Sequence, residues 1–351
     1  MKKVSIIGIV GIPASYGGFE SLVENLTRFS SDDIQYDVYC SSKQLPTKLD
    51  NHNRATLRYV PLKANGIQSI AYDIVSILRT LNHKSDVMLV LGVSGAIAIP
   101  VFKLFSRSKV ITNIDGLEWK REKWGRFARA FLKFSEAVAV KYSDVIITDN
   151  QAISDYVTKE YGHKSEVIAY GGDHALAHGN LTAPRIESPY FLTVCRIEPE
   201  NNIHLILDSF ANTKKHIKFV GNWSSNEYGR ELLRKYGSIA NIELINPIYD
   251  VNELYKLRMY CQGYIHGHSA GGTNPSLVEA MHFEKPIYAF DCNFNRFTTE
   301  NKAFYFDSSD SLASLLDNSQ LDITSTAQAM KEIASRRYTW EIIARQYESL
   351  Y

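Results

Sequence analysis

The sequence has few cysteines and almost no net charge, and both shortages exclude classes of protein. Its four cysteines are Cys40, Cys195, Cys261 and Cys292 among 351 residues. This isolated spacing excludes C-x-x-C redox motifs, zinc-finger motifs and a disulfide scaffold, and it is typical of a reducing compartment. Lys and Arg number 39 against 38 Asp and Glu. A net charge this close to zero argues against a protein that coats nucleic acid and against a highly charged tail.

Long apolar runs are also missing. No window reaches the roughly 18 apolar residues of a membrane-spanning helix; residues 87–101 come nearest, but glycines and Pro100 interrupt them. The opening residues 1–18 superficially resemble a signal peptide, with two Lys and then an apolar run. Their apolar run is short and punctuated by glycine, with no A-x-A cleavage site, so it predicts a buried first strand. We expect a cytoplasmic protein that is soluble or lies on a membrane surface.

The length and the alternation of apolar runs predict two domains. At roughly 150 residues per domain, 351 residues suggest two. Short β-branched runs alternate with stretches whose apolar residues recur every three or four positions, which is the βαβ pattern of a parallel, doubly wound sheet. In the first half the pattern predicts strands at 4–10, 36–40, 57–60, 87–91, 109–113 and 144–148, and helices at 19–30, 67–81, 96–105 and 125–141.

The pattern pauses at residues 171–189, where Gly, His, Pro, Asn and Ser cluster, and then resumes. We therefore predict an N-terminal domain at 1–175, a linker at 176–189 and a C-terminal domain at 190–337. The amphipathic segment 338–351 is expected to cross back to the first domain. In the second half the pattern predicts strands at 190–195, 217–220, 242–245, 263–266 and 286–290, and helices at 203–211, 227–236, 251–260 and 276–282.

A glycine-rich loop, GIVGIPASYGGFE at residues 8–20, follows the first strand. Backbone N–H groups there and the next helix N-terminus favour an anion. The loop lacks G-x-G-x-x-G, and no acidic residue ends the second strand, so a dinucleotide site is disfavoured. A tight turn without a ligand is the alternative.

A second motif, TVCRIEPENN at residues 193–202, follows the first strand of the second half. Arg196 at that strand end is suited to binding a phosphate through its forked donors. The alternative is an ion pair between Arg196 and Glu198 or Glu200.

The third motif, HGHSAGGTNPSLVEAM at residues 266–281, is the most specific. A strand runs into a glycine-rich loop, and a helix then begins near Pro275. Backbone N–H groups at 271–274 predict a site for a diphosphate or a sugar. Glu279, between the apolar Val278 and Ala280, is predicted to accept hydrogen bonds from ribose hydroxyls. A solvated surface carboxylate is the alternative.

At these three motifs the chain resembles the retaining family-4 glycosyltransferases of the glycosyltransferase-B fold. Three segments of this chain match motifs of that family. They are the G-G-x-E motif at 17–20, the R-x-x-P-E-K-like segment at 196–201 and the E-A-M end of an E-x7-E motif at 279–281. The resemblance covers essentially the whole chain and implies two Rossmann-like domains facing across a cleft. The wording IPASYGGFE, NIDGLEWKREKW and GGTNPSLVEAM is similar to bacterial rhamnosyltransferases of capsule, O-antigen and wall-polysaccharide assembly.

The resemblance, together with the motifs, implies a site for a nucleotide-diphospho-sugar, with dTDP-L-rhamnose as the donor that the resemblance suggests, and a lipid-diphosphate-linked saccharide acceptor. Two positions depart from the family pattern: Asn201 replaces a Lys, and Gly271 replaces the first Glu of E-x7-E. The second departure removes a polar anchor for glucose-like sugars and fits a deoxy sugar. The predicted donor-binding residues are Gly17, Gly18, Arg196, Asn246, Tyr249, His268, Gly272, Thr273, Asn274 and Glu279.

A pair of carboxylates follows the first-half strand at 109–113. Asp115 stands where the family often has a His, and Glu118 follows it. A carboxylate near the anomeric carbon deprotonates an acceptor hydroxyl or stabilises positive charge in the transition state, so both residues are catalytic candidates. The alternative is an Asp that caps the next helix.

The segment 119–134, WKREKWGRFARAFLKF, interleaves basic and aromatic residues, as do helices that lie on anionic membranes. The alternative is a core helix with a solvated basic face. The segment 119–134 accounts for the excess of basic residues in the first half: residues 1–180 contain 22 Lys and Arg against 18 Asp and Glu. The predicted acceptor or membrane residues are Trp119, Lys120, Arg121, Lys123, Trp124 and Arg126.

No D-x-D motif and no cluster of metal-ligand residues occurs in the sequence, so we expect no metal and no other cofactor. Arg196 and helix N-termini then carry the diphosphate charge. Three other functions stay open. They are the same chemistry with a UDP- or GDP-hexose donor, a sugar-nucleotide epimerase of the same fold, and a non-catalytic sugar-nucleotide-binding subunit.

Overall fold

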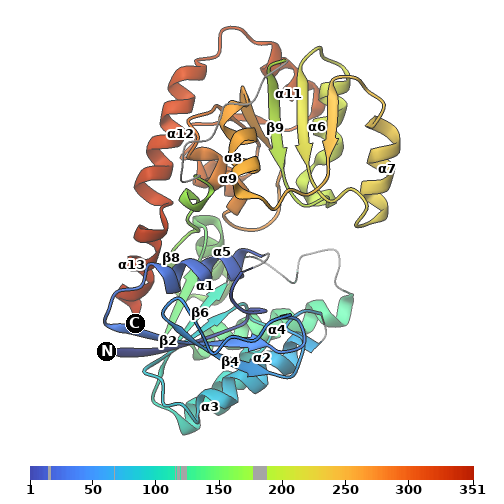
Figure 1. Ribbon diagram of the computed structural model, residues 1–351. Helices are drawn as coiled ribbons and strands as arrows, with labels where there is room; N and C mark the ends of the chain where they lie inside the picture. The colour runs from blue at the N-terminus through green and yellow to red at the C-terminus, as the bar shows by residue number, and fades with distance from the viewer. Residues whose placement is uncertain (15–16, 67, 115, 117–118, 120–124, 177–187) are drawn as a thin grey trace. The chain divides into compact units, whose positions relative to one another are not determined.

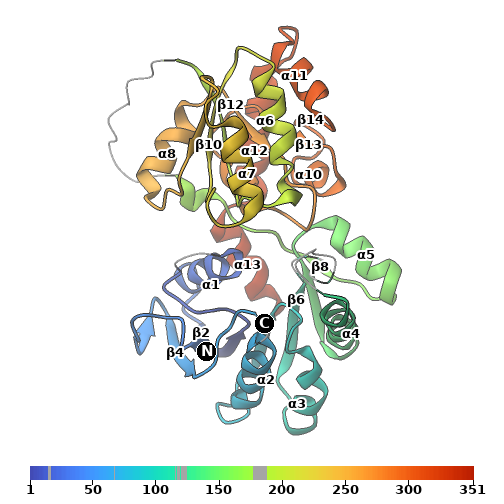
Figure 2. The same ribbon diagram turned by 90° about the vertical axis from the view of Figure 1, so that its right-hand side faces the viewer.

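A computed structural model describes residues 1–14, 17–66, 68–114, 116, 119, 125–176 and 188–351 (Figures 1 and 2). The chain divides into two compact units. The first contains residues 1–170 and 340–351, and the second contains residues 171–339. Each unit is an α/β unit built on its own largely parallel sheet, so the two doubly wound domains predicted from the sequence are confirmed.

The sheet of the first unit has eight strands in the order β3-β4-β2-β1-β5-β6-β7-β8. All neighbours pair in parallel except β3, which is antiparallel to β4. The central strands are buried along nearly their whole length, as expected of a parallel sheet covered by helices on both faces. The strands are β1 (Lys2–Ile7), β2 (Ile34–Ser41), β3 (Asn51–His52), β4 (Ala55–Val60), β5 (Val87–Leu91), β6 (Lys109–Ile114), β7 (Val145–Thr148) and β8 (Glu166–Val167).

Figure 1 draws helices α1 and α2 on opposite faces of this sheet. Helix α3 packs against α2 and α4, and α4 packs against α5. Helix α13 packs against α1, although it follows the entire second unit in sequence. The helices of the first unit are α1 (Gly18–Arg28), α2 (Gln68–Thr80), α3 (Ile99–Phe105), α4 (Arg126–Tyr142), α5 (Gln151–Tyr161) and α13 (Trp340–Leu350), with a 3₁₀ turn at Ala96–Ala98.

The sheet of the second unit has six parallel strands in the order β11-β10-β9-β12-β13-β14. Helix α6 packs against α7 and α11, whereas α9 packs against α12. The strands are β9 (Tyr190–Val194), β10 (His216–Val220), β11 (Ile242–Ile245), β12 (Gly263–His266), β13 (Ile287–Phe290) and β14 (Phe304–Phe306). The helices are α6 (Ile203–Ala211), α7 (Glu227–Tyr236), α8 (Val251–Tyr260), α9 (Pro275–Met281), α10 (Asn293–Thr298), α11 (Ser309–Asp317) and α12 (Ile323–Arg337), with 3₁₀ turns η3 (Asp173–Ala175) and η4 (Pro199–Asn201).

The first strand and the helix at 96–105 are the predicted elements that depart most from those observed, and the backbone explains each departure. Strand β1 ends at Ile7 rather than at residue 10, because Gly8 adopts φ +103° and a Cβ there would lie 2.0 Å from the carbonyl oxygen of Leu91. The single helix predicted at 96–105 is a 3₁₀ turn followed by α3. Pro100 stands in the first turn of α3, where it costs no hydrogen bond.

Candidate functional site

The strand order places the sequence motifs at the two topological switch points. In each sheet, successive strands are added first on one side and then on the other of a single point. This point lies between β1 and β5 in the first sheet and between β9 and β12 in the second. Ligands of open α/β sheets bind beyond the carboxyl ends of the strands at such points. The glycine-rich loop at 8–17 follows β1, whereas the Arg196 loop follows β9 and the glycine-rich loop at 267–274 follows β12. Each unit therefore presents its predicted ligand loops at its own switch point.

The glycine-rich loop of the first unit is shaped around the carboxylate of Glu20. Gly17 adopts φ +124°, and a Cβ on it would lie 2.0 Å from Oε2 of Glu20. The other oxygen, Oε1, accepts a hydrogen bond from the backbone N–H of Val10 at 2.9 Å. Burial raises the pKa of Glu20, and backbone hydrogen bonds from Val10 and from Glu20 itself oppose the rise. Gly17 and Gly18 thus stand at the start of α1, as predicted, beside an internal carboxylate.

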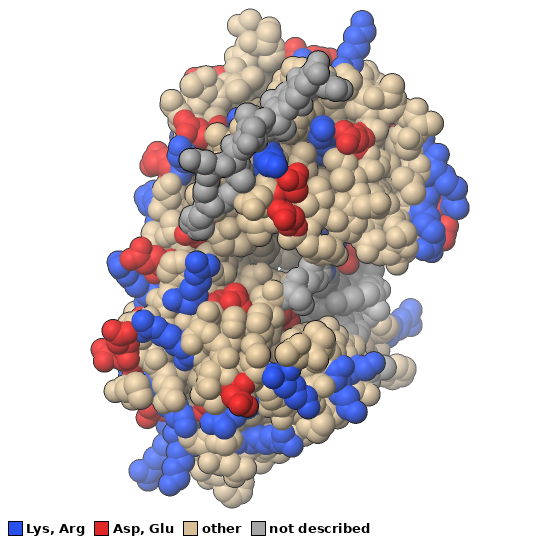
Figure 3. Space-filling model, viewed as in Figure 1, with Lys and Arg blue, Asp and Glu red and all other residues tan. Residues whose placement is uncertain are grey.

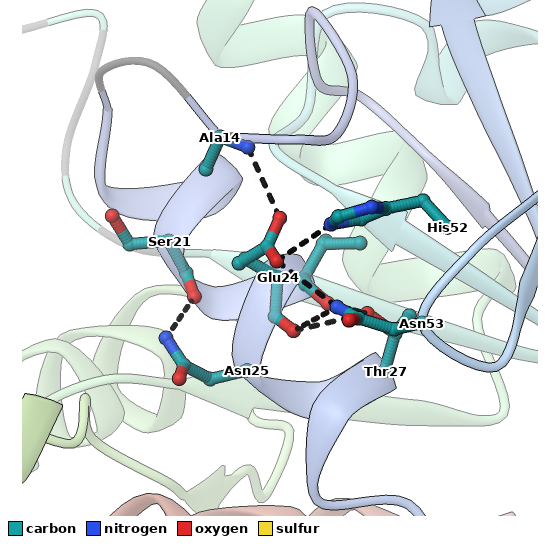
Figure 4. Close-up of polar contacts among 8 residues, drawn as sticks. Ala14, Ser21, Glu24, Asn25, Thr27, His52 and Asn53 are labelled. Atoms are coloured by element: carbon teal, nitrogen blue, oxygen red, sulfur yellow. Dashed lines mark hydrogen bonds and ion pairs between the residues drawn. The ribbon is translucent and has the colours of Figure 1, made fainter. Parts of the chain in front are cut away.

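A second carboxylate of α1, Glu24, ties the same loop to the β3–β4 turn (Figure 4). Its Oε2 accepts from the backbone N–H of Ala14 at 3.0 Å. Its Oε1 lies 2.7 Å from Nε2 of His52 and accepts from Nδ2 of Asn53 at 3.0 Å. Sequence reasoning missed this role. The available signal was the spacing of Glu20 and Glu24, which places both carboxylates on one side of the helix.

The structure also reveals a buried carboxyl group near the loop that follows β5. Asp73 of α2 accepts a hydrogen bond from the hydroxyl of Ser94. A Cβ on Gly95 would lie 2.3 Å from the Cβ of Asp73, so only glycine permits this close approach. Burial raises the pKa of Asp73 to about 7, although the bond from Ser94 lowers it. Nothing in the local sequence distinguishes Asp73 from a surface residue of a helix.

The predicted catalytic pair falls on positions that the structure does not describe. Asp115 and Glu118 lie outside the described residues, and so do Lys120, Arg121, Lys123 and Trp124. Two residues before Asp115, Asn113 is buried near the end of β6 and donates from Nδ2 to the hydroxyl of Tyr347 in α13. The catalytic assignment therefore stays a prediction.

Trp119 and Lys133 contact each other within the first unit. Nε1 of Trp119 donates to Oε2 of buried Glu136 at 3.2 Å. The ammonium of Lys133 lies 4.8–4.9 Å from the ring centroids of Trp119, Tyr156 and Tyr161, and it pairs with the carboxylate of Glu160 at 2.8 Å. Two residues of the predicted aromatic and basic segment thus serve internal packing.

Arg126, by contrast, is exposed at the first position of α4. In the described parts of the chain, no helix combines the length and the apolar character needed to cross a bilayer. The predicted membrane contact of this segment stays a prediction.

In the second unit, the loops after β9 and β12 are fastened together by asparagine side chains. Asn201 is buried; its Nδ2 donates to the carbonyl of Arg196 at 2.7 Å, and its Oδ1 lies 2.7 Å from Nδ1 of His268. Asn202 donates to the carbonyl of Gly267 at 2.8 Å, and Asn295 donates to the carbonyl of His268 at 2.8 Å. The residue at the family's Lys position therefore joins the two predicted donor loops.

The Asn201 contacts also assign the proton on His268. Nδ2 of Asn201 is the donor to the Arg196 carbonyl, so Oδ1 is an acceptor. Nδ1 of His268 must then carry a hydrogen in this hydrogen-bond network. The Nε2 atom lies 3.5 Å from the position of a Cβ built on Gly271. His268 is thus oriented toward the glycine-rich loop, and its contact with the donor stays a prediction.

Arg196 is exposed at the end of β9, and its guanidinium lies 3.6 Å from the carboxylate of Glu198. That distance makes a loose ion pair on a surface, where such pairs contribute little. Both expectations for Arg196 are therefore compatible with the structure, since the paired guanidinium stays accessible to a phosphate.

The loop at 271–274 ends in a helix cap. Oδ1 of Asn274 accepts from the backbone N–H and the hydroxyl of Ser276 at 3.0 and 2.9 Å, so this side chain closes the start of α9. Gly271 adopts φ +107° and is partly exposed, whereas Gly272 and Thr273 are buried. The capping role was not predicted for Asn274; its predicted contact with the donor stays a prediction.

Glu279 lies at the centre of a charged cluster rather than on the surface. Its Oε2 pairs with the guanidinium of Arg258 on α8, and its Oε1 lies 3.3 Å from Nε2 of His174 on η3. Burial raises the pKa of Glu279, but the charges of Arg258 and His174 outweigh it and hold the pKa below 4.5. The surface alternative is therefore wrong, and each carboxylate oxygen already has a side-chain partner.

A glycine allows η3 to approach α9 closely enough for this cluster. A Cβ on Gly172 would lie 2.6 Å from the carbonyl carbon and oxygen of Val278 and 2.7 Å from the nitrogen of Glu279. The backbone N–H of Gly172 donates to the carbonyl of Tyr338 at 2.8 Å. Residues 171–176, predicted as part of the first domain and linker, belong to the second unit.

The two residues predicted to border the base lie in the segment between β11 and α8. Asn246 is exposed, and Tyr249 is exposed next to Asp250, which caps α8. An aromatic ring in that position is free to cover a base, and this role stays a prediction. Among the described residues, no group of three or more His, Cys, Asp or Glu side chains could hold a metal ion. Metal independence stays an expectation as well.

Two family models match this chain, one in each half. Residues 182–336 match the family model described as glycosyl transferases group 1, and residues 1–173 match a domain of unknown function, DUF1972. Over residues 182–336 the chain is thus similar to group 1 glycosyl transferases. The matched region contains both predicted ligand loops of the second unit, with Arg196, His268 and Glu279. No curated protein matches the chain.

Solved structures agree with this assignment at the level of the fold. Sucrose-phosphate synthase from Thermosynechococcus elongatus has a TM-score of 0.81 at 14% identity, over 100% of this chain and 98% of that one. A glycosyltransferase from Rickettsia africae has a TM-score of 0.75 at 12% identity, over 99% and 97%. HepE of Anabaena, solved with UDP-glucose, has a TM-score of 0.71 at 14% identity, over 100% and 99%. The fold is that of the glycosyltransferase-B enzymes.

Proposed function

We propose that this glycosyltransferase moves L-rhamnose from dTDP-L-rhamnose to a lipid-diphosphate-linked saccharide in the assembly of a cell-surface polysaccharide. The anomeric configuration of the donor is retained. One observation carries the proposal most: the group 1 glycosyltransferase domain has Glu279 and the Arg196 and His268 loops at the switch point of its own sheet.

The nucleotide binds mainly to the second unit. Glu279 accepts a hydrogen bond from the sugar of the nucleoside, while Tyr249 and Asn246 border the base. A carboxylate whose two oxygens already meet Arg258 and His174 has limited capacity for further donors. This capacity suits a deoxyribose, which offers one hydroxyl, and therefore supports a dTDP donor over one with two vicinal hydroxyls.

The diphosphate leaves with its charge stabilised by fixed donors. Arg196 contacts it as an accessible guanidinium, and the backbone at Gly272 and Thr273 borders it. From the first unit, the N–H groups at Gly17 and Gly18 contribute the partial positive charge of a helix N-terminus. In this mechanism, electrostatic stabilisation of the leaving group supplies much of the rate enhancement.

Two features of the sequence support rhamnose as the sugar. Gly271 stands where the resemblance places a carboxylate that anchors sugar hydroxyls, and His268 Nε2 is the nearest atom to its absent side chain, at 3.5 Å. The sugar then contacts backbone and His268, which suits a deoxy sugar. Asp115 acts on the acceptor side, as a base or as an electrostatic stabiliser of the oxocarbenium-like transition state.

A UDP-hexose donor is the second candidate, because HepE of Anabaena shares the fold and was solved with UDP-glucose. The deciding experiment incubates the purified protein and a lipid-diphosphate-linked saccharide with a panel of nucleotide sugars, and identifies the product by mass. We expect product with dTDP-L-rhamnose. Product with another donor alone overturns the rhamnosyl assignment. The configuration of the new linkage, read by NMR coupling constants, tests retention.

The role of Asp115 has its own test. We expect Asp115→Asn to lower kcat by at least about 100-fold, the range seen for general acid–base groups, with an unchanged melting temperature. Unchanged turnover removes Asp115 from the mechanism without affecting the donor assignment.

A further inference from the structure

Residues 92–95, which we call the β5 loop, lie beside the glycine-rich loop that follows β1. Strands β1 and β5 pair in parallel on either side of the switch point of the first sheet. A Cβ on Gly8 would lie 2.0 Å from the carbonyl oxygen of Leu91, so the segments that leave the two strands are in direct contact. A Cβ on the next residue, Gly92, would lie 3.8 Å from the ring of Phe19 in α1.

The backbone of the β5 loop is fixed by three neighbouring elements. The N–H of Gly92 donates to the carbonyl of Asn113 in β6 at 2.9 Å. The fully buried Ser135 of α4 donates from its hydroxyl to the carbonyl of Val93. The last glycine of the loop packs against α2 and leaves no room for a Cβ. The loop backbone is therefore held by β6, α4 and α2, independently of its one polar side chain.

That polar side chain belongs to Ser94, and its hydrogen bond has a defined direction. Ser94 is partly exposed, and its hydroxyl donates to Oδ2 of Asp73 in α2. An ionised carboxylate can only accept, so the single hydrogen of the hydroxyl is committed to Asp73 and only the lone pairs of Oγ remain. An oxygen with free lone pairs binds a donor, such as a hydroxyl or an amide N–H of a ligand, and not a phosphate oxygen.

The fold retains Asp73 although this carboxyl group lowers its stability. Burial raises the pKa of Asp73 to about 7, which means that the folded state disfavours the ionised form. A leucine, of nearly the same shape, would carry no such penalty. Buried carboxyl groups with a strongly shifted pKa gather at functional sites. Because the loop backbone is held by other contacts, the role left for Asp73 is to orient the Ser94 hydroxyl.

The surroundings of Ser94 suit a neutral ligand. Residues 87–102 contain no charged residue, and neither do residues 64–72 that precede Asp73. Elsewhere, Lys, Arg, Asp and Glu side chains are spread over the visible surface of the first unit around α1, α2 and α3 (Figures 1 and 3). The ring of Phe19 adds an apolar surface beside the loop. An apolar ring next to one oriented polar group matches a sugar, which has both C–H faces and hydroxyls.

From this arrangement we infer that Ser94, oriented by Asp73, accepts a hydrogen bond from a hydroxyl group of the acceptor saccharide. The inference rests on the proposed function, which supplies a saccharide acceptor. Ser94 thereby determines specificity, because a site that hydrogen-bonds a substrate hydroxyl rejects an analogue without it. Asp73 is a positioning residue: it does not touch the saccharide and acts through the direction of the Ser94 hydrogen bond.

The test measures binding of acceptor analogues to the full chain by calorimetry at pH 8.5, where Asp73 is ionised because its pKa is about 7. The analogues carry glucose, galactose, N-acetylglucosamine or rhamnose, linked through a diphosphate to a short alkyl chain. We expect Ser94→Ala to bind the best of them about five- to tenfold more weakly than the parent protein. Analogues that lack one hydroxyl are then compared. One of them should bind the parent protein with the same loss and lose nothing further in Ser94→Ala, since both changes remove one hydrogen bond.

Matched controls come from the same loop and from α2. Ser135→Ala removes a hydroxyl that holds the loop but is buried in α4, so this variant should bind the analogues like the parent protein. Asp73→Leu removes the acceptor for the Ser94 hydrogen and should weaken binding as Ser94→Ala does. Asp73→Asn offers an amide oxygen to the same hydrogen and should restore binding. Neither Asp73 variant should melt below the parent protein at this pH, because both remove a buried charge.

Three results overturn the inference. They are no binding of any analogue to the parent protein, equal weakening in Ser135→Ala, and additive losses for every deoxy analogue in Ser94→Ala. Transfer from a panel of nucleotide sugars to the same analogues is measured in parallel. Binding that depends on Ser94, without transfer from any donor, refutes the proposed function alone. Transfer with a KM for the acceptor that Ser94→Ala leaves unchanged refutes the role of Ser94 alone.

Discussion

The ion pair between Glu279 and Arg258 makes a prediction that separates folding from nucleotide binding. The Arg258 side chain is 5% exposed and that of Glu279 is 17% exposed. Glu279→Gln keeps the shape of the side chain but removes its charge, so the guanidinium stays buried without its counter-charge. Nε of Arg258 already has no hydrogen-bond partner among the described residues. We therefore expect a large loss of stability from a residue proposed to bind substrate.

The magnitude follows from the burial. Removing one partner of a buried ion pair costs about 3–5 kcal/mol. The partial exposure of Glu279 places this pair at the lower end, so we expect about 3 kcal/mol from Glu279→Gln. Arg258→Met costs less, because His174 still pairs with the carboxylate. The double variant leaves no unpaired charge between these two positions and should recover about 2 kcal/mol relative to the sum of the single variants.

The assay measures stability and ligand binding on the same four proteins. Urea unfolding, followed by fluorescence, gives the free energies of unfolding, and calorimetry with a nucleoside diphosphate gives the dissociation constants. If Glu279 holds the nucleoside sugar, the double variant regains stability but still binds at least about tenfold more weakly, equivalent to about 1.4 kcal/mol. The exposed Glu227, which pairs with Arg230 and Arg234, is the control, and Glu227→Gln should change neither quantity.

Two outcomes refute this reasoning. Additive stability losses in the double variant show that the two side chains do not act as a pair. Full recovery of nucleotide binding together with stability shows that Glu279 supports the fold alone and does not bind the nucleoside.

Three further predictions concern the loops. Gly17→Ala, at φ +124° and against the Glu20 carboxylate, should lower the free energy of unfolding by about 1–3 kcal/mol in urea titrations. The pKa of Asp73 is about 7 in the folded protein against 3.8 unfolded, so stability falls as pH rises between these values; Asp73→Asn should flatten that dependence between pH 5 and 8. Asn201→Ala should weaken nucleotide binding at least about tenfold by calorimetry, because the variant loses the contacts of Asn201 with the Arg196 carbonyl and with His268.

Each of these predictions has a contrary result. Gly125→Ala is the control for Gly17, since no atom of the described residues lies within 4 Å of its added Cβ; equal losses contradict the argument from φ. An unchanged pH dependence in Asp73→Asn shows that another group titrates. Nucleotide binding of Asn201→Ala equal to that of the parent protein shows that the position of His268 does not matter for the ligand.

The sequence predicted most of the sheet-forming segments because periodicity is a local property. The helix at 203–211 and the strand at 263–266 have the predicted bounds, since a strong apolar pattern defines each. Helix α12 escaped prediction because small and polar residues fill most of its length, and only tertiary packing buries Met330 and Ile333.

The candidate site was harder to predict, because its partners are distant in sequence. Glu279 stood out locally, but His174 is separated from it by the greater part of the second unit, and Arg258 lies on a different helix. From the sequence, Asn201 was interpreted only as the replacement of a Lys that the family pattern has at this position. Its actual contacts, to the Arg196 carbonyl and to His268, depend on how two loops approach each other. No residue pattern along the chain encodes such an approach.

The return of α13 to the first unit has a consequence for synthesis. Trp340, Ile343 and Tyr347 are buried in that unit, yet they are translated after all of residues 171–339. On the ribosome, the second unit therefore has its complete sequence while the first still lacks one helix. The usual order, in which the N-terminal domain matures first, is reversed here. A nascent chain halted before residue 340 carries a finished second unit and, in the first, an open apolar face that a chaperone would recognise.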